Sequence, residues 1–125
     1  MKSLSNIKFI GDILVYDEPF LSLYYDYKEK AYALFLKANN MEKKNIYLFF
    51  YVNKENIMEF LNESAGLWDI ASNKKIYTTE KRLNGSFMKV SEVKSHENIT
   101  ELKSNDMFDS DYCIDYCEII WQLNN

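Results

Sequence analysis

The hydrophobic pattern of the chain centres on residues 45–52, where seven apolar or aromatic residues follow Asn45 without a polar interruption. A run of this length, rich in aromatic and β-branched residues, predicts a strand that is covered on both faces. The segments before it have the character of strands that could pair with it, and those after it could form a cover. We therefore expect residues 45–52 to form the central strand of a sheet.

Three segments upstream also have the character of strands: residues 13–16, 20–26 and 31–38. The first ends before Pro19, which cannot donate a hydrogen bond to a strand ladder. Short polar turns connect these segments to one another and to the central strand, which predicts an antiparallel meander. Residues 1–12 are compatible with either a short edge strand or a docked arm.

A helix is expected directly after the central strand, because Asn53 is a good N-cap. The apolar residues that follow fall at helical spacing: Ile57, Phe60, Leu61 and Ala65. Gly66 stands where a C′ residue ends a helix. The next residues, 67–70, predict a second short helix or turn that inserts Trp68 into the core.

A hairpin is predicted at Asn84–Gly85, since both flanking segments, 75–83 and 86–93, alternate between apolar and polar residues. Asn-Gly is typical of a type I′ turn, in which both central residues have positive φ. We expect this hairpin to extend the sheet.

The last segment, Asp111–Leu123, predicts a helix that lies on the sheet, capped by Asp109 or Ser110. Its polar stripe consists of Asp111, Asp115, Glu118 and Gln122. Its expected buried side consists of Cys113, Tyr116, Cys117, Ile120 and Leu123. A final strand is the alternative, because residues 119–123 are β-prone.

These elements together predict one α+β domain over residues 1–125. Its sheet is antiparallel and has about five or six strands, supplied by the meander and the Asn-Gly hairpin. One helix follows the central strand and another ends the chain. Twenty of the 125 residues are aromatic, which provides much of the apolar area for a core.

Three motifs occur in a suggestive order: Gly-Asp-Ile-Leu-Val-Tyr-Asp-Glu-Pro over residues 11–19, the helical segment 53–61, and Ala-Gly-Leu-Trp-Asp-Ile over residues 65–70. In this order, over about residues 11–80, the chain resembles a family of small bacterial and phage domains of unknown function. In that family a strand, an acidic-Pro turn and a second strand precede a helix and a short Gly-Leu-x-Asp segment. The resemblance implies a small α+β domain, and it implies no activity or site residue.

The net charge of −4 and the pI of about 5 disfavour non-specific contact with nucleic acid or anionic lipid. Only Arg82 among the fifteen basic residues is an arginine, and Asn, Lys, Ile and Tyr are abundant. This usage is typical of AT-rich genes and indicates a low-GC bacterium or its phage as the source. We predict no nucleic-acid partner and no membrane partner.

The expected compartment is the cytoplasm. Residues 7–16 are interrupted by Asp12 and lack the small-residue cleavage site of a signal peptide. No segment approaches the roughly 20 apolar residues that span a bilayer. The two cysteines are therefore expected to be reduced thiols.

The sequence predicts no catalytic residue, no cofactor and no metal site. Cys113 and Cys117 share a helical face, but zinc needs about four such ligands and the single histidine, His96, lies in a separate polar segment. No nucleophile motif accompanies His96, which is expected to be an exposed histidine. The three glycines are too scattered to cradle a phosphate.

A protein-binding surface is the hypothesis that the charge pattern favours. Residues 104–125 carry five carboxylates and no lysine or arginine. They are Asp106, Asp109, Asp111, Asp115 and Glu118. Such a stripe can steer a basic partner, and the alternative is a solvated helix N-terminus.

Tyrosines are also more numerous in the predicted meander than a sheet of this size can bury with satisfied hydroxyls. Tyr24, Tyr27 and Tyr32 are the candidates for an exposed aromatic patch, and tyrosine is enriched at protein interfaces. The alternative is a solvated sheet face with the hydroxyls in water. An exposed aromatic strand edge is also compatible with a homodimer.

We therefore expect a non-enzymatic protein-binding module, such as an immunity protein, an antitoxin or a phage-encoded inhibitor of a bacterial defence protein. The alternative function is a domain that sequesters or senses a small molecule or nucleotide in an aromatic pocket.

Overall fold

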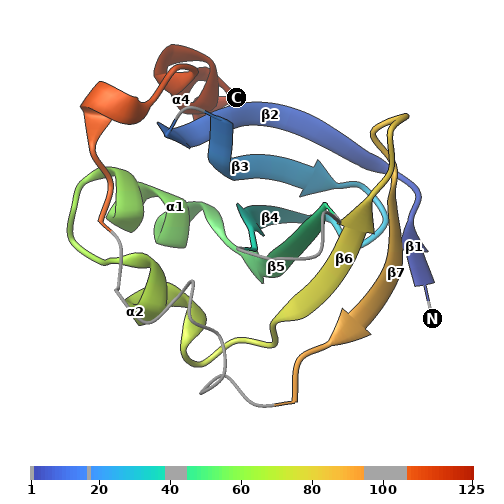
Figure 1. Cartoon of the computed structure of the whole chain (residues 1–125). Helices are drawn as coiled ribbons and strands as arrows, with labels where there is room; N and C mark the ends of the chain where they lie inside the picture. Colours follow the sequence, from blue (N-terminus) through green and yellow to red (C-terminus); the bar gives the residue numbers. More distant parts are fainter. Residues whose placement is uncertain (1, 17, 39–44, 95–106) are drawn as a thin grey trace.

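The computed structural model of the chain describes residues 2–16, 18–38, 45–94 and 107–125. It is an antiparallel sheet with short helices, which confirms the predicted α+β class (Figure 1). Its strands are β1 (Lys2–Leu4), β2 (Ile7–Tyr16), β3 (Glu18–Asp26), β4 (Ala31–Lys37), β5 (Ile46–Val52), β6 (Tyr77–Lys81) and β7 (Phe87–Glu92). Its helices are α1 (Lys54–Leu61), α2 (Leu67–Ala71), the 3₁₀ turn η2 (Ser110–Tyr112) and α4 (Tyr116–Asn124).

The strand order is β1-β7-β6-β5-β4-β3-β2, with every neighbouring pair antiparallel. Strands β2 to β5 form the predicted meander, and β5 occupies the central position. The sheet has six strands of five to ten residues and, in addition, the three-residue strand β1. The prediction of five or six strands left residues 1–12 undecided, and these residues supply β1 and more than half of β2.

The sheet is strongly curled, because its two edge strands, β1 and β2, are consecutive in the chain and only Ser5 and Asn6 separate them. Figure 1 shows the chain passing from β1, beside β7, directly into β2. The ring of Tyr24 on β3 lies 5.5 Å from the ring of Phe87 on β7, although three strands separate these two in the sheet. A flat sheet would place them about 19 Å apart at the usual strand spacing.

The two faces of the sheet carry different cores. The convex face packs against the helices through apolar residues such as Leu34, Leu36 and Phe50, all fully buried. The concave face holds a separate aromatic cluster built on Ala33, Phe35, Phe49 and Phe87. Because side chains alternate along a strand, β4 and β5 contribute to both cores at once, which confirms that the central strand is covered on both faces.

Helix α1 follows β5 directly and begins at the predicted N-cap. The Asn53 side chain accepts a hydrogen bond from the Asn56 backbone N–H, and the Asn56 side chain accepts one from the Asn53 N–H. The reciprocal pair satisfies two of the backbone donors that a helix start leaves open.

The prediction that Gly66 ends this helix is wrong. Helix α1 stops at Leu61, and Glu63 adopts the positive φ of 61° in the turn that follows. Gly66 instead precedes α2, where its N–H donates to the Asp69 carboxylate. In α2, Leu67, Ile70 and Ala71 are buried, whereas Trp68 is only half-buried against the helix-side core.

The Asn84–Gly85 hairpin between β6 and β7 is present, but its predicted turn type is wrong. Gly85 has a φ of 88°, whereas Asn84 is not among the residues with positive φ, so a type I′ turn is excluded. The Gly85 N–H donates to the Arg82 carbonyl and the Arg82 N–H donates to the Ser86 carbonyl. This is a three-residue loop with the glycine in the left-handed region. The Asn84 side chain stabilises it by accepting from both the N–H and the hydroxyl of Ser86.

The C-terminal segment is α-helical only from Tyr116, and not from Asp111 as predicted. The chain is extended at Cys113, between η2 and α4. This break changes which residues face the sheet: Ile119 and Leu123 are buried, whereas Tyr116 and Cys117 are exposed. The predicted buried side is therefore wrong at Tyr116 and Cys117, whereas Leu123 is buried and Cys113 and Ile120 are partly buried against the core. The alternative of a final strand over residues 119–123 is wrong.

Helix α4 lies against β2 at the upper edge of the molecule in Figure 1. Among the helices that the structure describes, none has the length and hydrophobicity required to cross a lipid bilayer.

Candidate functional site

The predicted acidic stripe is divided between structural and exposed carboxylates. Asp106 lies outside the described residues. Asp109 caps η2, its Oδ1 accepting from the Asp111 N–H at 3.0 Å. Asp115 is half-buried, and its Oδ2 accepts from the Asp12 N–H of β2 at 2.8 Å. Asp111 and Glu118 are exposed, and they are the members of the stripe best placed to meet a partner.

The predicted tyrosine candidates do not form one patch. Tyr24 lies on the concave face, between Phe9 and Phe87. Tyr27 is exposed and Tyr32 is half-buried, and both make edge-to-face ring contacts with Tyr25 at 5.0 Å. These two lie on the turn and strand after β3, far in the sequence from the acidic residues, and Tyr32 shares a shallow depression with the chain end at Asn125.

The C-terminal segment exposes more large apolar side chains than any other described part of the chain. Half of the ten exposed large hydrophobic residues fall between positions 107 and 121. They are Met107, Tyr112, Ile114, Tyr116 and Trp121. Trp121 is 58 % exposed and Ile114 is 71 % exposed, values that a core role does not explain.

A shallow groove of about 360 Å³ runs along the outer side of α4, lined by Tyr116, Cys117, Ile120, Trp121 and the last two asparagines. Tyr112 extends the apolar surface toward β2, where its ring lies 4.9 Å from that of Tyr16. We call the exposed side chains of residues 107–121, with Asp109, Asp111 and Glu118 among them, the C-terminal face.

Trp121 and Tyr112 were not among the residues predicted to bind a partner. A signal was present in the sequence, because Ile119, Ile120 and Trp121 are consecutive. Successive residues of an α-helix are about 100° apart, so three in a row cannot all face the sheet. At least one of them must therefore be exposed or must meet a partner.

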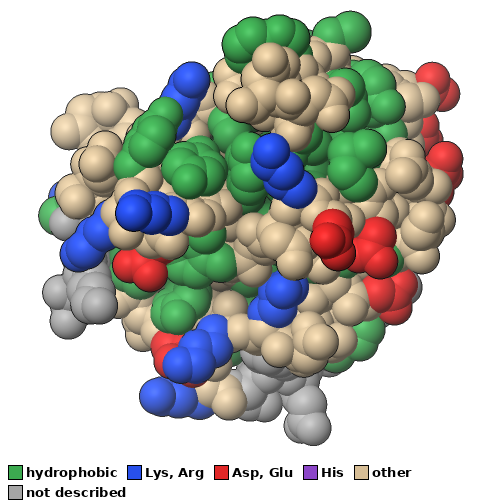
Figure 2. Space-filling model, turned by 180° about the vertical axis from the view of Figure 1, so that it is seen from behind, with side chains coloured by type: hydrophobic (Ala, Val, Ile, Leu, Met, Phe, Trp, Pro, Cys, Tyr) green, Lys and Arg blue, Asp and Glu red, His purple; other side chains and the backbone are tan. Residues whose placement is uncertain are grey.

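A second candidate site is a cleft of about 620 Å³ on the concave side of the sheet, which we call the concave cleft. It is lined by side chains from five strands and by the hairpin tip: Ile7, Phe9, Asp12, Pro19, Ser22, Tyr24, Lys37, Tyr47, Lys81 and Gly85. Its size is within the range of small-molecule sites. On the reverse side of the molecule, hydrophobic side chains gather over the upper part, with lysine or arginine side chains among them (Figure 2).

The polar groups of the concave cleft come from opposite sides of it. The Lys81 ammonium lies 5.8 Å from the ring centroids of both Tyr47 and Phe87, within the range of a cation–π contact. Across the cleft, the Asp12 carboxylate accepts a hydrogen bond of 2.6 Å from the Ser22 hydroxyl. Burial, together with Tyr47 and Asp12 nearby, raises the pKa of Tyr24 to about 12.

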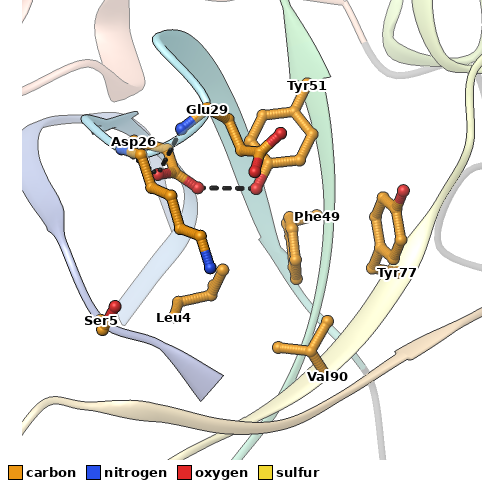
Figure 3. A pocket seen from close by; sticks show the side chains of 9 residues that line it. Leu4, Ser5, Asp26, Glu29, Phe49, Tyr51, Tyr77 and Val90 are labelled. Atoms are coloured by element: carbon orange, nitrogen blue, oxygen red, sulfur yellow. Dashed lines mark hydrogen bonds between the residues drawn. The ribbon is translucent and has the colours of Figure 1, made fainter. Parts of the chain in front are cut away.

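A smaller pocket of about 140 Å³ surrounds Asp26 at the other end of the concave face (Figure 3). Asp26 is 3 % exposed, and its carboxylate accepts hydrogen bonds from the Tyr51 hydroxyl at 2.7 Å and from the backbone N–H groups of Lys28 and Glu29. Desolvation and the hydrogen bond to Asp26 raise the pKa of Tyr51. The carboxylate is thus fully engaged in holding the β3–β4 turn, and we assign it a structural role.

The cysteines are free thiols and do not form a pair. Cys113 is half-buried, and its Sγ contacts the Asp12 carbonyl at 3.7 Å. Desolvation raises the pKa of this thiol, which disfavours the reactive thiolate. Within residues 2–16, 18–38, 45–94 and 107–125, no three His, Cys, Asp or Glu side chains are grouped so as to hold a metal ion. His96 lies outside these ranges.

Comparison of the chain with protein-family models, with curated proteins and with solved structures finds no match in any of the three. The candidate sites are therefore judged on their geometry and chemistry alone.

Proposed function

We propose that the protein is a non-enzymatic protein-binding module that uses its C-terminal face to bind a partner with a basic surface. The observation that carries the proposal is the 58 % exposure of Trp121 beside the groove of α4. Tryptophan and tyrosine are the residues most enriched among the few that dominate binding energy at protein interfaces. An exposed tryptophan has a large apolar area to bury on association.

Charge complementarity supports the choice of a basic partner. Residues 107–125 contain four carboxylates and no lysine, arginine or histidine. Asp111 and Glu118 are exposed beside the apolar residues, so they would lie at the polar rim of an interface centred on Trp121. Charges at a rim mainly increase the association rate and make it sensitive to salt.

The same features are consistent with the class expected from the sequence: an immunity protein, an antitoxin or a phage-encoded inhibitor of a bacterial defence protein. Such proteins act by occupying another protein's surface, and a small acidic domain with one aromatic face is suited to that task. We propose this class, with the C-terminal face as its binding surface.

Site-specific photo-crosslinking in the producing cells tests the proposal. A photoreactive phenylalanine analogue replaces Trp121 in one variant and Leu83, a fully exposed residue at the hairpin tip, in the control. We expect one protein to crosslink from position 121 and not from position 83. Purified, that protein should bind the wild type with an affinity that falls as salt rises, and Glu118→Lys should weaken binding.

Two results would contradict the proposal. The first is a set of crosslinks from position 121 that is no different from the set at position 83. The second is a specific partner whose affinity does not change with salt or with the charge of residue 118.

A further inference from the structure

We infer that the concave cleft is a binding site for a small flat aromatic ligand that carries an anionic group, a phosphate or a carboxylate. The cleft lies on the concave face of the sheet, and the helices, α4 among them, cover the opposite face. It is therefore separate from the C-terminal face that we propose binds a protein.

The curl of the sheet creates the cleft. Phe9 and Tyr24 come from β2 and β3 near one edge, whereas Lys81 comes from β6, on the other side of the central strand. In a flat sheet these groups would not face one another. The cleft volume of about 620 Å³ is sufficient for a ligand of the size of a mononucleotide.

The aromatic lining provides a stacking surface. Phe9 is 47 % exposed although its ring packs against Tyr24 at 5.4 Å, so one part of the ring is left uncovered beside the cleft. Tyr24 in turn contacts the buried rings of Phe35 and Phe87, which fix its position. A planar ring that stacks on Phe9 or Tyr24 would bury this apolar area, as nucleobases do on aromatic side chains in other proteins.

The charged lining favours an anion. Lys37 on β4 pairs directly with Tyr47 on β5, and Lys81 lies over the ring of Tyr47, so the two lysines flank one tyrosine. Among the described residues that line the cleft, one is acidic: Asp12, whose carboxylate accepts a hydrogen bond from the Ser22 hydroxyl. The described lining therefore carries a charge of +1 in a protein whose net charge is −4. Lysine is a common phosphate-binding residue in proteins.

The arrangement gives each part of the ligand a place. The aromatic ring stacks at the Phe9 and Tyr24 side, and the anionic group meets Lys37 and Lys81 at the Tyr47 side. Because Asp12 repels an anion, its removal should strengthen binding, whereas removal of Lys81 should weaken it. This opposite sign distinguishes the site from a non-specific apolar cleft.

Titration with matched probes tests the inference. The probes are adenosine 5′-monophosphate against adenosine, and indole-3-acetate against indole, each followed by the change in melting temperature and by NMR. We expect the anionic member of at least one pair to bind at least tenfold more tightly than its neutral counterpart. The ratio of affinities within each pair isolates the contribution of the anionic group, which is a phosphate in the first pair and a carboxylate in the second.

Variants locate the bound probe. Lys81→Met should weaken binding of the preferred anion by about tenfold, the loss expected for one charge-assisted hydrogen bond. Phe9→Ala should weaken the binding of both members of the pair, and Asp12→Asn should strengthen the binding of the anionic member. The charge-matched control Lys75→Met, on an exposed lysine six residues from Lys81, should leave binding unchanged.

The inference is overturned if none of the anionic probes binds in the millimolar range. It is also overturned if a probe binds equally well to wild type, Lys81→Met and Asp12→Asn, since the contact would then lie elsewhere. Trp121→Ser, which alters the C-terminal face, should bind the probes as the wild type does, so this result is independent of the proposed protein partner.

Discussion

The Asp115 carboxylate accepts a hydrogen bond of 2.8 Å from the Asp12 backbone N–H, across 103 positions of sequence. This contact joins the start of α4 to the middle of β2. The Cys113 thiol lies at 3.7 Å from the carbonyl of the same residue, Asp12. The side chains of Asp115 and Cys113 thus attach the C-terminal segment to backbone groups of β2. The apolar packing of Ile119 and Leu123 adds to this attachment.

Asp115→Ala should destabilise the fold, because it leaves a partly buried N–H of β2 without its acceptor. The expected loss is about 1–3 kcal/mol in the free energy of unfolding, measured by urea denaturation. The control is Asp111→Ala, an exposed carboxylate four residues earlier, for which we expect a change within about 0.5 kcal/mol. Equal effects of the two substitutions would contradict the structural role of Asp115.

Gly11→Ala should loosen the docking of α4. A Cβ at residue 11 would lie 2.8 Å from the Cβ of Asp115 and 2.9 Å from Cγ1 of Ile119, closer than real contacts allow. We expect a loss of about 1–3 kcal/mol, typical of overpacking. Hydrogen exchange should show faster exchange in α4 with little change in β4 and β5, and unchanged protection of α4 would show that glycine is not required there.

Tyr51→Phe should destabilise the protein through the buried Asp26 carboxylate. The substitution removes the hydroxyl that donates to Asp26 at 2.7 Å, while the two backbone donors of the β3–β4 turn remain. A lost hydrogen bond to a charged group costs about 1.5–3 kcal/mol. Tyr77→Phe, in the same pocket, is the matched control and should cost less. A reversed order of the two losses in thermal or urea unfolding would refute the assignment.

The stability of the protein should fall at alkaline pH, in part because of Tyr24. Its pKa is raised from 10.0 to about 12, chiefly because burial disfavours the phenolate. The folded protein therefore holds this proton at a pH where the unfolded chain has lost it. The contribution of Tyr24 to the free energy of unfolding is fully present below pH 10 and is lost as the pH rises from 10 toward 12.

Urea denaturation at several values between about pH 8 and pH 11 measures this decrease. Tyr24→Phe should show a smaller fall than the wild type, with part of the fall remaining because Tyr32 and Tyr51 also have raised pKa values. An identical pH dependence in the two proteins would mean that the Tyr24 hydroxyl is as exposed in the folded state as in the unfolded chain.

Elements whose signals are local could be predicted from the amino-acid sequence. The seven-residue apolar run identified the central strand, because a strand covered on both faces needs apolar residues at every position and aromatic and β-branched residues favour a strand over a buried helix. The side chains of Asn53 and Asn84 and the positive φ of Gly85 act within a few residues of their own positions, so the start of α1 and the position of the hairpin were evident from the sequence. The resemblance to a family of small bacterial and phage domains remains a prediction.

Elements that depend on contacts across the chain were decided only by the tertiary structure. The register of α4 follows from its attachment to Asp12 and from the close fit of Ile119 against Gly11, and no periodicity within residues 111–123 contains that information. Asp115, which the sequence predicted to bind a partner, therefore has a structural role in this attachment. The resulting register of α4 leaves Trp121 exposed.

The concave cleft is the clearest case of a feature that only the tertiary structure supplies. Nothing local to Phe9, Tyr24 or Lys81 indicates that they share one cavity, because they lie on three strands spread across the sheet. They meet because two residues connect the opposite edge strands β1 and β2, and this short connection forces the sheet to curl around its own aromatic face.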